Sequence, residues 1–235
     1  MEKKSTTEPR RKPVDETAGR RRRILDAAFS AFMKGGYAAT STREIATHAR
    51  VSKRALYQLF GSKQEMLAAS ISERAKRLQV PADLPVPRDR EMLARVLATF
   101  GAQLLREVTD PTVIGVFRLA IAEAVSAPEV AWSLDSIGRE TSRAALRELM
   151  TRAQSTGLLG GDPAEMAEQF AGLLWGNLIV SLLLRVVDRP TDPEIERRAA
   201  AAAGTFLKAH PEPDDAATAG RSATDVKEPQ DTTAI

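Results

Sequence analysis

The sequence of 235 residues predicts an all-α protein. Alternation of apolar and polar residues rich in Val, Ile and Thr, which is typical of strands, is nearly absent. Proline and glycine stand mostly at the boundaries of amphipathic segments. Four prolines also stand at expected helix starts, where their missing N–H costs nothing. They are Pro111, Pro128, Pro163 and Pro193.

The N-terminal part is predicted to hold four helices. The first spans about residues 17–34 and ends at Gly35-Gly36, because glycine readily adopts the left-handed conformation that closes a helix. Three short helices follow and complete a domain at residues 17–79. Residues 1–16 are expected to form a disordered basic arm. The proline-rich segment at residues 80–87 is the predicted linker to a second domain.

The second domain is predicted at residues 88–210 and consists of five longer helices. Asp110, Asp162 and Asp192 precede three of them and are the expected N-caps, because a carboxylate there accepts a hydrogen bond from a free backbone N–H. The tail at residues 211–235 is rich in Ala, Thr, Asp and Pro and is expected to be disordered. The predicted helices are residues 88–108, 111–126, 128–156, 163–188 and 193–209.

The composition argues against several classes of protein. The chain has no cysteine, so it forms no disulfide and no thiolate metal site, and we expect a cytoplasmic location. The charged N-terminus lacks the apolar core of a signal peptide. The longest apolar run, residues 173–184, is too short to cross a membrane, which takes about 20 residues. No metal and no cofactor is predicted, since the sequence contains no His-Glu-x-x-His motif and no phosphate-binding glycine-rich loop.

The net charge of +3 is unevenly distributed. Residues 1–79 contain 18 Lys and Arg against 8 Asp and Glu, a net charge of +10. The other 156 residues contain 16 and 23, a net charge of −7. A basic part joined to an acidic part indicates that the first part binds a polyanion such as DNA. A solvated basic tail is the alternative, but it explains residues 3–12 and not the cations spaced through residues 20–63.

One short span contains the signature of a helix-turn-helix. Ser41 and Glu44 match the capping box, in which a hydroxyl and a carboxylate bind the free N–H groups at a helix start. Ser62 and Glu65 repeat this pattern, and Ser52 offers a third N-cap between them. The predicted result is a short helix, a turn, a second short helix and a third helix start.

The outward face of the second short helix carries two cations near its N-terminus, followed by Tyr57 and Gln58. Because cations there oppose the helix dipole, Lys53 and Arg54 are poorly placed unless a phosphate or a guanine edge lies nearby. We expect these two to reach bases in the major groove and Tyr57 to reach a phosphate, as Lys63 would from the next helix start. The alternative is that these are ordinary exposed charges and that Tyr57 is a packing residue. The predicted DNA-binding residues are Thr42, Arg43, Arg50, Ser52, Lys53, Arg54, Tyr57, Gln58 and Lys63.

The stretch TSTREIATHARVSKRALYQLFGSKQEML resembles the DNA-binding domain of the tetracycline-repressor (TetR) family. With the first helix and its Gly-Gly-Tyr end, the resemblance covers about residues 20–70. The later stretch DPAEMAEQFAGLLWG is similar to the penultimate helix of a branch with an AefR-like C-terminal domain. The matching residues are Ile45-Ala46, Ala49-Arg50-Val51-Ser52, Leu56-Tyr57, Phe60 and Ser62-Lys63 with Glu65.

The resemblance implies a homodimeric transcriptional regulator, most often a repressor, that binds a palindromic operator and is released by a small apolar or amphipathic molecule. Two residues depart from the family pattern. Arg50 replaces the glycine of the turn, which costs roughly 1 kcal/mol if the backbone there is left-handed. Ala55 stands where many relatives have Thr or Ser, which removes one potential phosphate contact. Both departures argue against transferring a relative's operator sequence.

By resemblance, the second domain provides the dimer interface. Gly172 and Gly176 are four residues apart, as are Ala199 and Ala203, so each of the last two long helices has a face of small residues that permits close approach. Val180 extends the apolar surface. The alternative is that these faces pack only within one chain. The predicted interface residues are Gly172, Gly176, Val180, Ala199 and Ala203.

A ligand pocket in the second domain is predicted from apolar side chains with a few polar groups that would orient a ligand. A simple hydrophobic core would use most of the same residues, so a DNA-binding protein without an inducer is the alternative. An enzyme is not predicted, because His48 and His210 are the only histidines and neither has a catalytic motif around it. The predicted pocket residues are Phe100, Leu104, Phe117, Arg118, Ile121, Trp132, Met150, Trp175 and Asn177.

Overall fold

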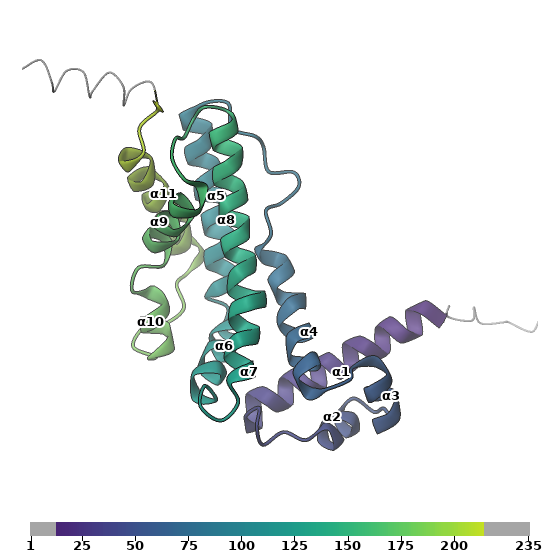
Figure 1. The fold of residues 1–235 in the computed structure, drawn as a ribbon. Coiled ribbons are helices and arrows are strands. Elements are labelled where there is room, and N and C mark those ends of the chain that lie inside the picture. The colour runs from purple at the N-terminus through teal and green to yellow at the C-terminus, as the bar shows by residue number, and fades with distance from the viewer. Residues whose placement is uncertain (1–12, 214–235) are drawn as a thin grey trace, which may run out of the picture. The chain divides into compact units, whose positions relative to one another are not determined.

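The computed structural model describes residues 13–213 and confirms the all-α fold class, since these residues form helices and no strand. Residues 1–12 of the predicted basic arm and residues 214–235 of the predicted tail lie outside the described residues. The described chain divides into two compact units, each with its own core (Figure 1). Unit 1 comprises residues 13–76 and 115–139, and unit 2 comprises residues 77–114 and 140–213.

Unit 1 contains the helices of the predicted DNA-binding domain. In it, α1 packs against α2 and α4, while the segment after α6 packs against α4 (Figure 1). Its core includes Phe32 of the first helix and Leu56 of the third, both fully buried. The elements are α1 (Pro13–Gly35), α2 (Thr42–His48), α3 (Lys53–Leu59), α4 (Lys63–Ala75), most of α6 (Pro111–Ala122), α7 (Pro128–Ser133) and the π-helical turn η2 (Leu134–Arg139).

Unit 2 is a helical bundle in which α5 packs along α11, and α9 packs against α8 and α11. Its core contains the aromatic side chains of Phe170 and Phe206, whose rings are in an edge-to-face contact with 5.5 Å between their centres. A short 3-10 turn, η1 (Lys76–Leu78), follows α4. The helices of unit 2 are α5 (Arg90–Val108), α8 (Glu140–Ser155), α9 (Pro163–Trp175), α10 (Leu178–Leu183) and α11 (Asp192–Ala209).

The helix starts agree with the sequence in most places and differ in two. Helix α1 begins at Pro13 and not at residue 17, so the end of the expected disordered arm is helical. Asp162 caps α9 as predicted, by accepting from the Ala164 N–H at 3.2 Å. For α11 the predicted cap Asp192 is wrong, because it is the first helical residue. Thr191 precedes the helix, and its N–H donates to Glu194 at 2.8 Å.

The long helix predicted at residues 163–188 is two helices. Gly176 ends α9 in a left-handed conformation with φ of +44°, which a residue with a side chain rarely adopts. The Arg198 guanidinium from α11 donates to the carbonyls of Leu174 and Trp175, the last residues of α9. The break is therefore held by a residue distant in the sequence.

The boundary between the units also differs from the predicted linker. Residues 115–139, which were expected within the second domain, belong to unit 1. Val116, Val130 and Leu134 from this segment are buried in the core of unit 1, so apolar packing places the segment there. Within residues 13–213, no helix is both long enough and apolar enough to span a membrane.

Candidate functional site

The helix starts of the helix-turn-helix in unit 1 have the three serine N-caps that the sequence predicts. The hydroxyls of Ser41, Ser52 and Ser62 each accept a hydrogen bond at 3.1 Å from the backbone N–H three residues later. The return contacts differ from the predicted capping boxes. At the first start the Glu44 carboxylate makes no return hydrogen bond among the described residues, and at the third start Glu65 accepts from the Gly61 N–H at 3.0 Å. These N-caps determine where α2, α3 and α4 begin.

The turn between α2 and α3 has the left-handed backbone on which the predicted cost of Arg50 depends. Its φ is +54°, the region in which a glycine is favoured, so the side chain costs roughly 1 kcal/mol there. The Arg50 N–H donates to Thr47 at 3.1 Å, and the next N–H, of Val51, donates to Ala46 at 3.0 Å. These hydrogen bonds close the turn and leave the Arg50 side chain exposed.

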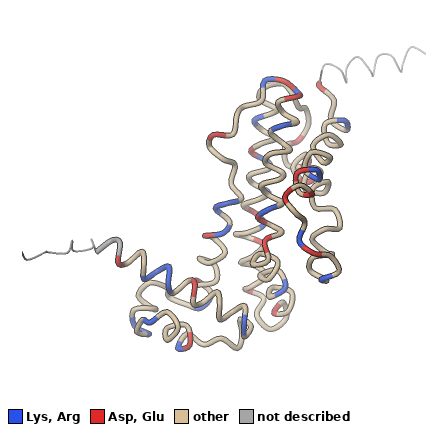
Figure 2. The backbone as a smooth tube through the Cα atoms, turned by 180° about the vertical axis from the view of Figure 1, so that it is seen from behind, with Lys and Arg blue, Asp and Glu red and all other residues tan. Residues whose placement is uncertain are grey.

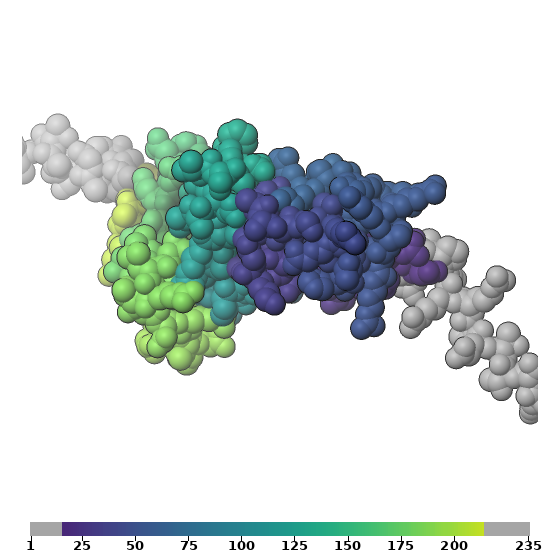
Figure 3. Space-filling model, turned by 90° about the horizontal axis from the view of Figure 1, so that it is seen from below, coloured from purple at the N-terminus to yellow at the C-terminus, as the bar shows by residue number. Residues whose placement is uncertain are grey.

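Helix α3 exposes the face that the sequence assigns to DNA. Leu56 is fully buried and Phe60 nearly so, while Lys53, Arg54 and Gln58 are exposed. Tyr57 is 44 % exposed, so it does not serve as a core residue. This surface and that of α2 appear in Figure 3 in dark purple and blue.

Helix α2 contributes the neighbouring part of this face. The Thr42 hydroxyl lies 3.1 Å from the Tyr57 hydroxyl, and the Lys53 ammonium lies 5.8 Å from the centre of the Tyr57 ring. Arg43 is exposed one residue further along α2. Together these side chains form the recognition surface, which comprises Thr42, Arg43, Lys53, Arg54, Tyr57 and Gln58.

Ser52 and Lys63 are engaged within the protein. The Ser52 hydroxyl accepts from the Ala55 N–H and so serves as the cap of α3. The Lys63 ammonium donates to the carbonyls of Tyr37 (2.8 Å), Ala38 (3.3 Å) and Thr40 (3.2 Å). It also lies 4.3 Å from the centre of the Tyr37 ring. The prediction that Lys63 offers its charge to phosphate is therefore corrected, because its three donors already bind the loop before α2.

The cations of α1 are only partly free for DNA. Arg20 forms an ion pair with Glu16 at 3.2 Å, and the Arg21 guanidinium stacks on the Phe60 ring at 4.6 Å. Figure 2 shows the cations along this helix in blue. Arg23 makes no ion pair within the described residues and faces a groove between α1 and α2.

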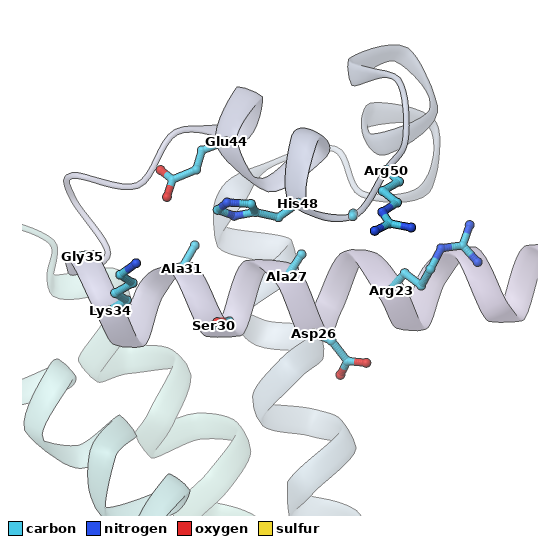
Figure 4. Close-up of a pocket in the computed structure, with 11 residues that line it drawn as sticks. Arg23, Asp26, Ala27, Ser30, Ala31, Lys34, Gly35, Glu44, His48 and Arg50 are labelled. Atoms are coloured by element: carbon cyan, nitrogen blue, oxygen red, sulfur yellow. The ribbon is translucent and has the colours of Figure 1, made fainter.

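This groove was not predicted from the sequence. It has a volume of about 820 Å³, and Ala27, Ala31 and Ala49 leave it open because their side chains are small. Figure 4 shows Arg50 lying toward α1 on the side of Arg23. Charges of both signs line the groove, which distinguishes it from the apolar pocket expected in the second domain. The charged and polar lining residues are Arg23, Asp26, Ser30, Lys34, Glu44, His48 and Arg50.

The residues predicted to line a ligand pocket are divided between the two units. In unit 2, the side chains of Phe100, Leu104 and Met150 are fully buried in the core, Trp175 packs against that core and Asn177 is exposed. In unit 1, Phe117 and Arg118 are half-buried, whereas Ile121 is 63 % and Trp132 70 % exposed. The predicted set is therefore not one cluster of side chains, because its members belong to two separate units, and a ligand pocket stays a prediction.

The predicted dimer residues also separate. Ala199 and Ala203 of α11 are buried in the core of their own unit, and Gly176 ends α9, so these three do not form a free face. Gly172 is exposed with open space around it, and Val180 is 56 % exposed. The exposed small residues of α11 are instead Ala200, Ala201 and Gly204. Ile195 and Phe206 could have identified the buried side of α11 from the sequence. Ile195 lies four residues before Ala199 and Phe206 three residues after Ala203, so the four share one helix face.

A capped helix-turn-helix whose second helix exposes two cations and a phenol defines a DNA-binding protein of the helix-turn-helix class. Residues 24–70 match the family described as bacterial regulatory proteins, tetR family. Residues 95–211 match the AefR-like transcriptional repressor, C-terminal domain. The chain belongs to the TetR family of transcriptional regulators. Proteins of this family bind DNA, act as dimers and are not enzymes.

Relatives and solved structures agree with this assignment. The HTH-type transcriptional repressor KstR of Rhodococcus jostii is 29 % identical over 71 % of this chain and 74 % of its own. The structure of the flavonoid-responsive regulator FrrA is 31 % identical, with a TM-score of 0.69, over 83 % of this chain and 98 % of its own. A TetR regulator from Agrobacterium tumefaciens is 27 % identical, with a TM-score of 0.69, over 84 % of this chain and 97 % of its own.

Proposed function

We propose that this regulator represses transcription by binding a palindromic operator as a homodimer. The recognition surface carries the proposal, because its cations and its phenol are exposed together on α2 and α3. One helix-turn-helix contacts few base pairs, whereas two copies related by a two-fold axis read two half-sites about 34–36 Å apart. As a bacterial regulator it would act in the cytoplasm, where the chromosome lies.

The second copy would dock on unit 2. Leu173, Val180 and Leu184 are 39 %, 56 % and 67 % exposed, so a partner chain docked there would cover apolar side chains that this chain leaves open to water. Gly172 and Gly204 leave open space beside α9 and α11, so two helices from a partner could approach closely. Burial of this apolar surface would stabilise the dimer.

Release by a small apolar or amphipathic molecule is supported by the relative FrrA, which is described as flavonoid-responsive. Such a ligand must bind more tightly to a conformer whose two recognition surfaces no longer match successive major grooves. A constitutive DNA-binding protein without an inducer is the second candidate. The observation in its favour is that Phe100, Leu104 and Met150 fill the core of unit 2.

Selection of bound DNA from a random pool tests the function directly. We expect a palindrome whose half-sites are separated by about one helical turn. A pool that shows no enrichment, or enrichment of a single half-site, would contradict the proposal. Titration of small molecules against the operator complex then separates the two candidates, because an inducer must release DNA and saturating DNA must weaken inducer binding by the same factor.

A further inference from the structure

The loop from Gly36 to Ser41 joins α1 to α2 and determines where α2 begins. Gly36 ends α1 with a φ of +85°, and its N–H donates to the Phe32 carbonyl at 3.0 Å. The Thr40 hydroxyl donates back to the Gly36 carbonyl at 2.7 Å. The remaining backbone groups of a loop like this need partners from elsewhere in the protein.

Glu123, directly after α6, supplies one of these partners from 85 positions away. One carboxylate oxygen accepts from the Ala38 N–H at 3.1 Å, and the other accepts from the Ser126 hydroxyl at 2.8 Å. The Ala38 N–H and then the Ser126 hydroxyl lower the pKa of Glu123, so the charged form is the one held. A side chain at Gly36 would place its Cβ 3.0 Å from the Glu123 carboxylate, so the fit is close.

The same loop is held from another direction by Lys63, whose ammonium binds three of its carbonyls. The Tyr37 side chain between them is buried and lies 5.2 Å from the Phe32 ring. Burial, and the hydrogen-bonded Glu129 carboxylate after it, raise the pKa of Tyr37 to about 12. Carboxylates from the segment after α6 therefore bind donors of the loop, while a cation from α4 binds its acceptors.

The position of this loop affects the recognition surface. Thr42 is the first residue of α2 and follows the loop directly, and its hydroxyl lies 3.1 Å from the Tyr57 hydroxyl of α3. A displacement of the loop would therefore move Thr42 relative to Tyr57. A misplacement of this kind lowers affinity for DNA even when every contacting side chain is present.

We propose that Glu123 is a positioning residue for DNA recognition, which fixes the loop before α2 and with it the start of the recognition surface. The inference rests on the proposed function and goes beyond it, because Glu123 lies outside residues 24–70, the segment that matches the DNA-binding family. It makes the end of α6 a functional part of the DNA-binding unit.

Two substitutions separate the reach of Glu123 from its charge. Glu123→Gln keeps an acceptor oxygen at the same distance and loses the charge, whereas Glu123→Asp keeps the charge and is one methylene too short. We expect Glu123→Asp and Glu123→Ala to weaken binding to the selected operator about 5- to 10-fold, which corresponds to the loss of one intramolecular hydrogen bond of ordinary net strength. Glu123→Gln should stay within about 2-fold of the wild type, because the hydrogen bond to the loop remains.

The control is Glu44→Gln, which removes the charge of an exposed acid of α2 whose carboxylate forms no hydrogen bond or ion pair within residues 13–213. Loss of a negative charge alone strengthens DNA binding, so the control should bind equally or more tightly, the opposite sign to Glu123→Ala. Thermal unfolding of each variant shows that the comparison is made between folded proteins.

Hydrogen exchange at the Ala38 amide, measured without DNA, tests the loop contact by itself. Exchange should be faster in Glu123→Asp and Glu123→Ala and unchanged in Glu123→Gln. Operator affinity that follows charge and not reach, or equal affinity in all three variants, would overturn the inference. If the wild type selects no operator, the proposed function fails, whereas a failure of the positioning role leaves wild-type operator binding intact and changes only the comparison among variants.

Discussion

Lys63 provides a sharp test because the structure and the family resemblance assign it different roles. In the structure its ammonium binds three carbonyls of the loop before α2 and lies over the Tyr37 ring. A hydrogen bond involving a charged group contributes about 1.5–3 kcal/mol, and an exposed cation–π contact about 0.5–1 kcal/mol. The ammonium is only half-buried, so in the Lys63→Met variant water can donate to some of the carbonyls that it leaves. We therefore expect the substitution to lower the free energy of unfolding by about 2 kcal/mol.

Urea unfolding followed by circular dichroism measures this change. The matched control is Lys53→Met, on the exposed face of α3, which should change the free energy of unfolding by no more than about 0.5 kcal/mol. The salt dependence of operator binding gives the complementary result. A phosphate contact at Lys63 would reduce the slope by about 1 per site when it is lost. A Lys63→Met protein of wild-type stability with a reduced slope would refute the structural role.

Three further predictions concern the turn, the recognition surface and the dimer. Arg50→Gly should raise the free energy of unfolding by roughly 1 kcal/mol, because glycine relieves the left-handed strain, whereas the same change at helical Arg43 should lower it by about 1 kcal/mol; denaturant unfolding compares the two. Arg54→Ala should weaken operator binding by about 1–3 kcal/mol and relax preference at one position in each half-site, and equal enrichment of all bases by the wild type there would contradict this. Val180→Asp should give monomers with unchanged helical content in sedimentation, while Ala199→Asp should lower stability because Ala199 is buried.

The local signals in the sequence predicted the helix-turn-helix closely. The three serine caps lie within a few residues of the groups they bind, so sequence spacing determines their geometry. The left-handed backbone at Arg50 could also be foreseen, because the family pattern has glycine there. Which face of α3 is buried follows from the four-residue spacing of apolar Leu56 and Phe60 among polar neighbours. Such features need no knowledge of the rest of the fold.

The buried side of α11 was predicted wrongly because its sequence is small on all sides. Residues 199–204 read AAAAAG, so any pair four apart looks like a face for close packing. The larger neighbours Ile195 and Phe206 identify the side of α11 that faces the core, since both are buried together with Ala199 and Ala203. The break at Gly176 was missed for a related reason: a glycine within an apolar run is compatible with either a close helix contact or a helix end.

Contacts between distant segments could not be predicted from the sequence. Nothing in the neighbourhood of Lys63 indicates that its partners are carbonyls more than 20 residues away, and the same holds for Glu123 and Ala38. A lysine at a helix start is equally compatible with phosphate binding, so the family pattern favoured that role. Only the position of the loop between them distinguishes the two roles.

These contacts matter for DNA binding because residues 115–139 belong to the same unit as the helix-turn-helix. Helix α6 begins in unit 2 and ends in unit 1, where Val116 and Ala120 are buried in the core beneath the helix-turn-helix. A boundary placed at the proline-rich segment would separate α1 to α4 from this packing and from Glu123. The surface that binds DNA in our proposal is therefore stabilised by residues 115–139 as well as by residues 24–70. A change of conformation that moves the end of α6 relative to the loop before α2 must alter the support of that loop. The hydrogen bond from the Ala38 N–H to the Glu123 carboxylate is 3.1 Å long and would break on a large displacement.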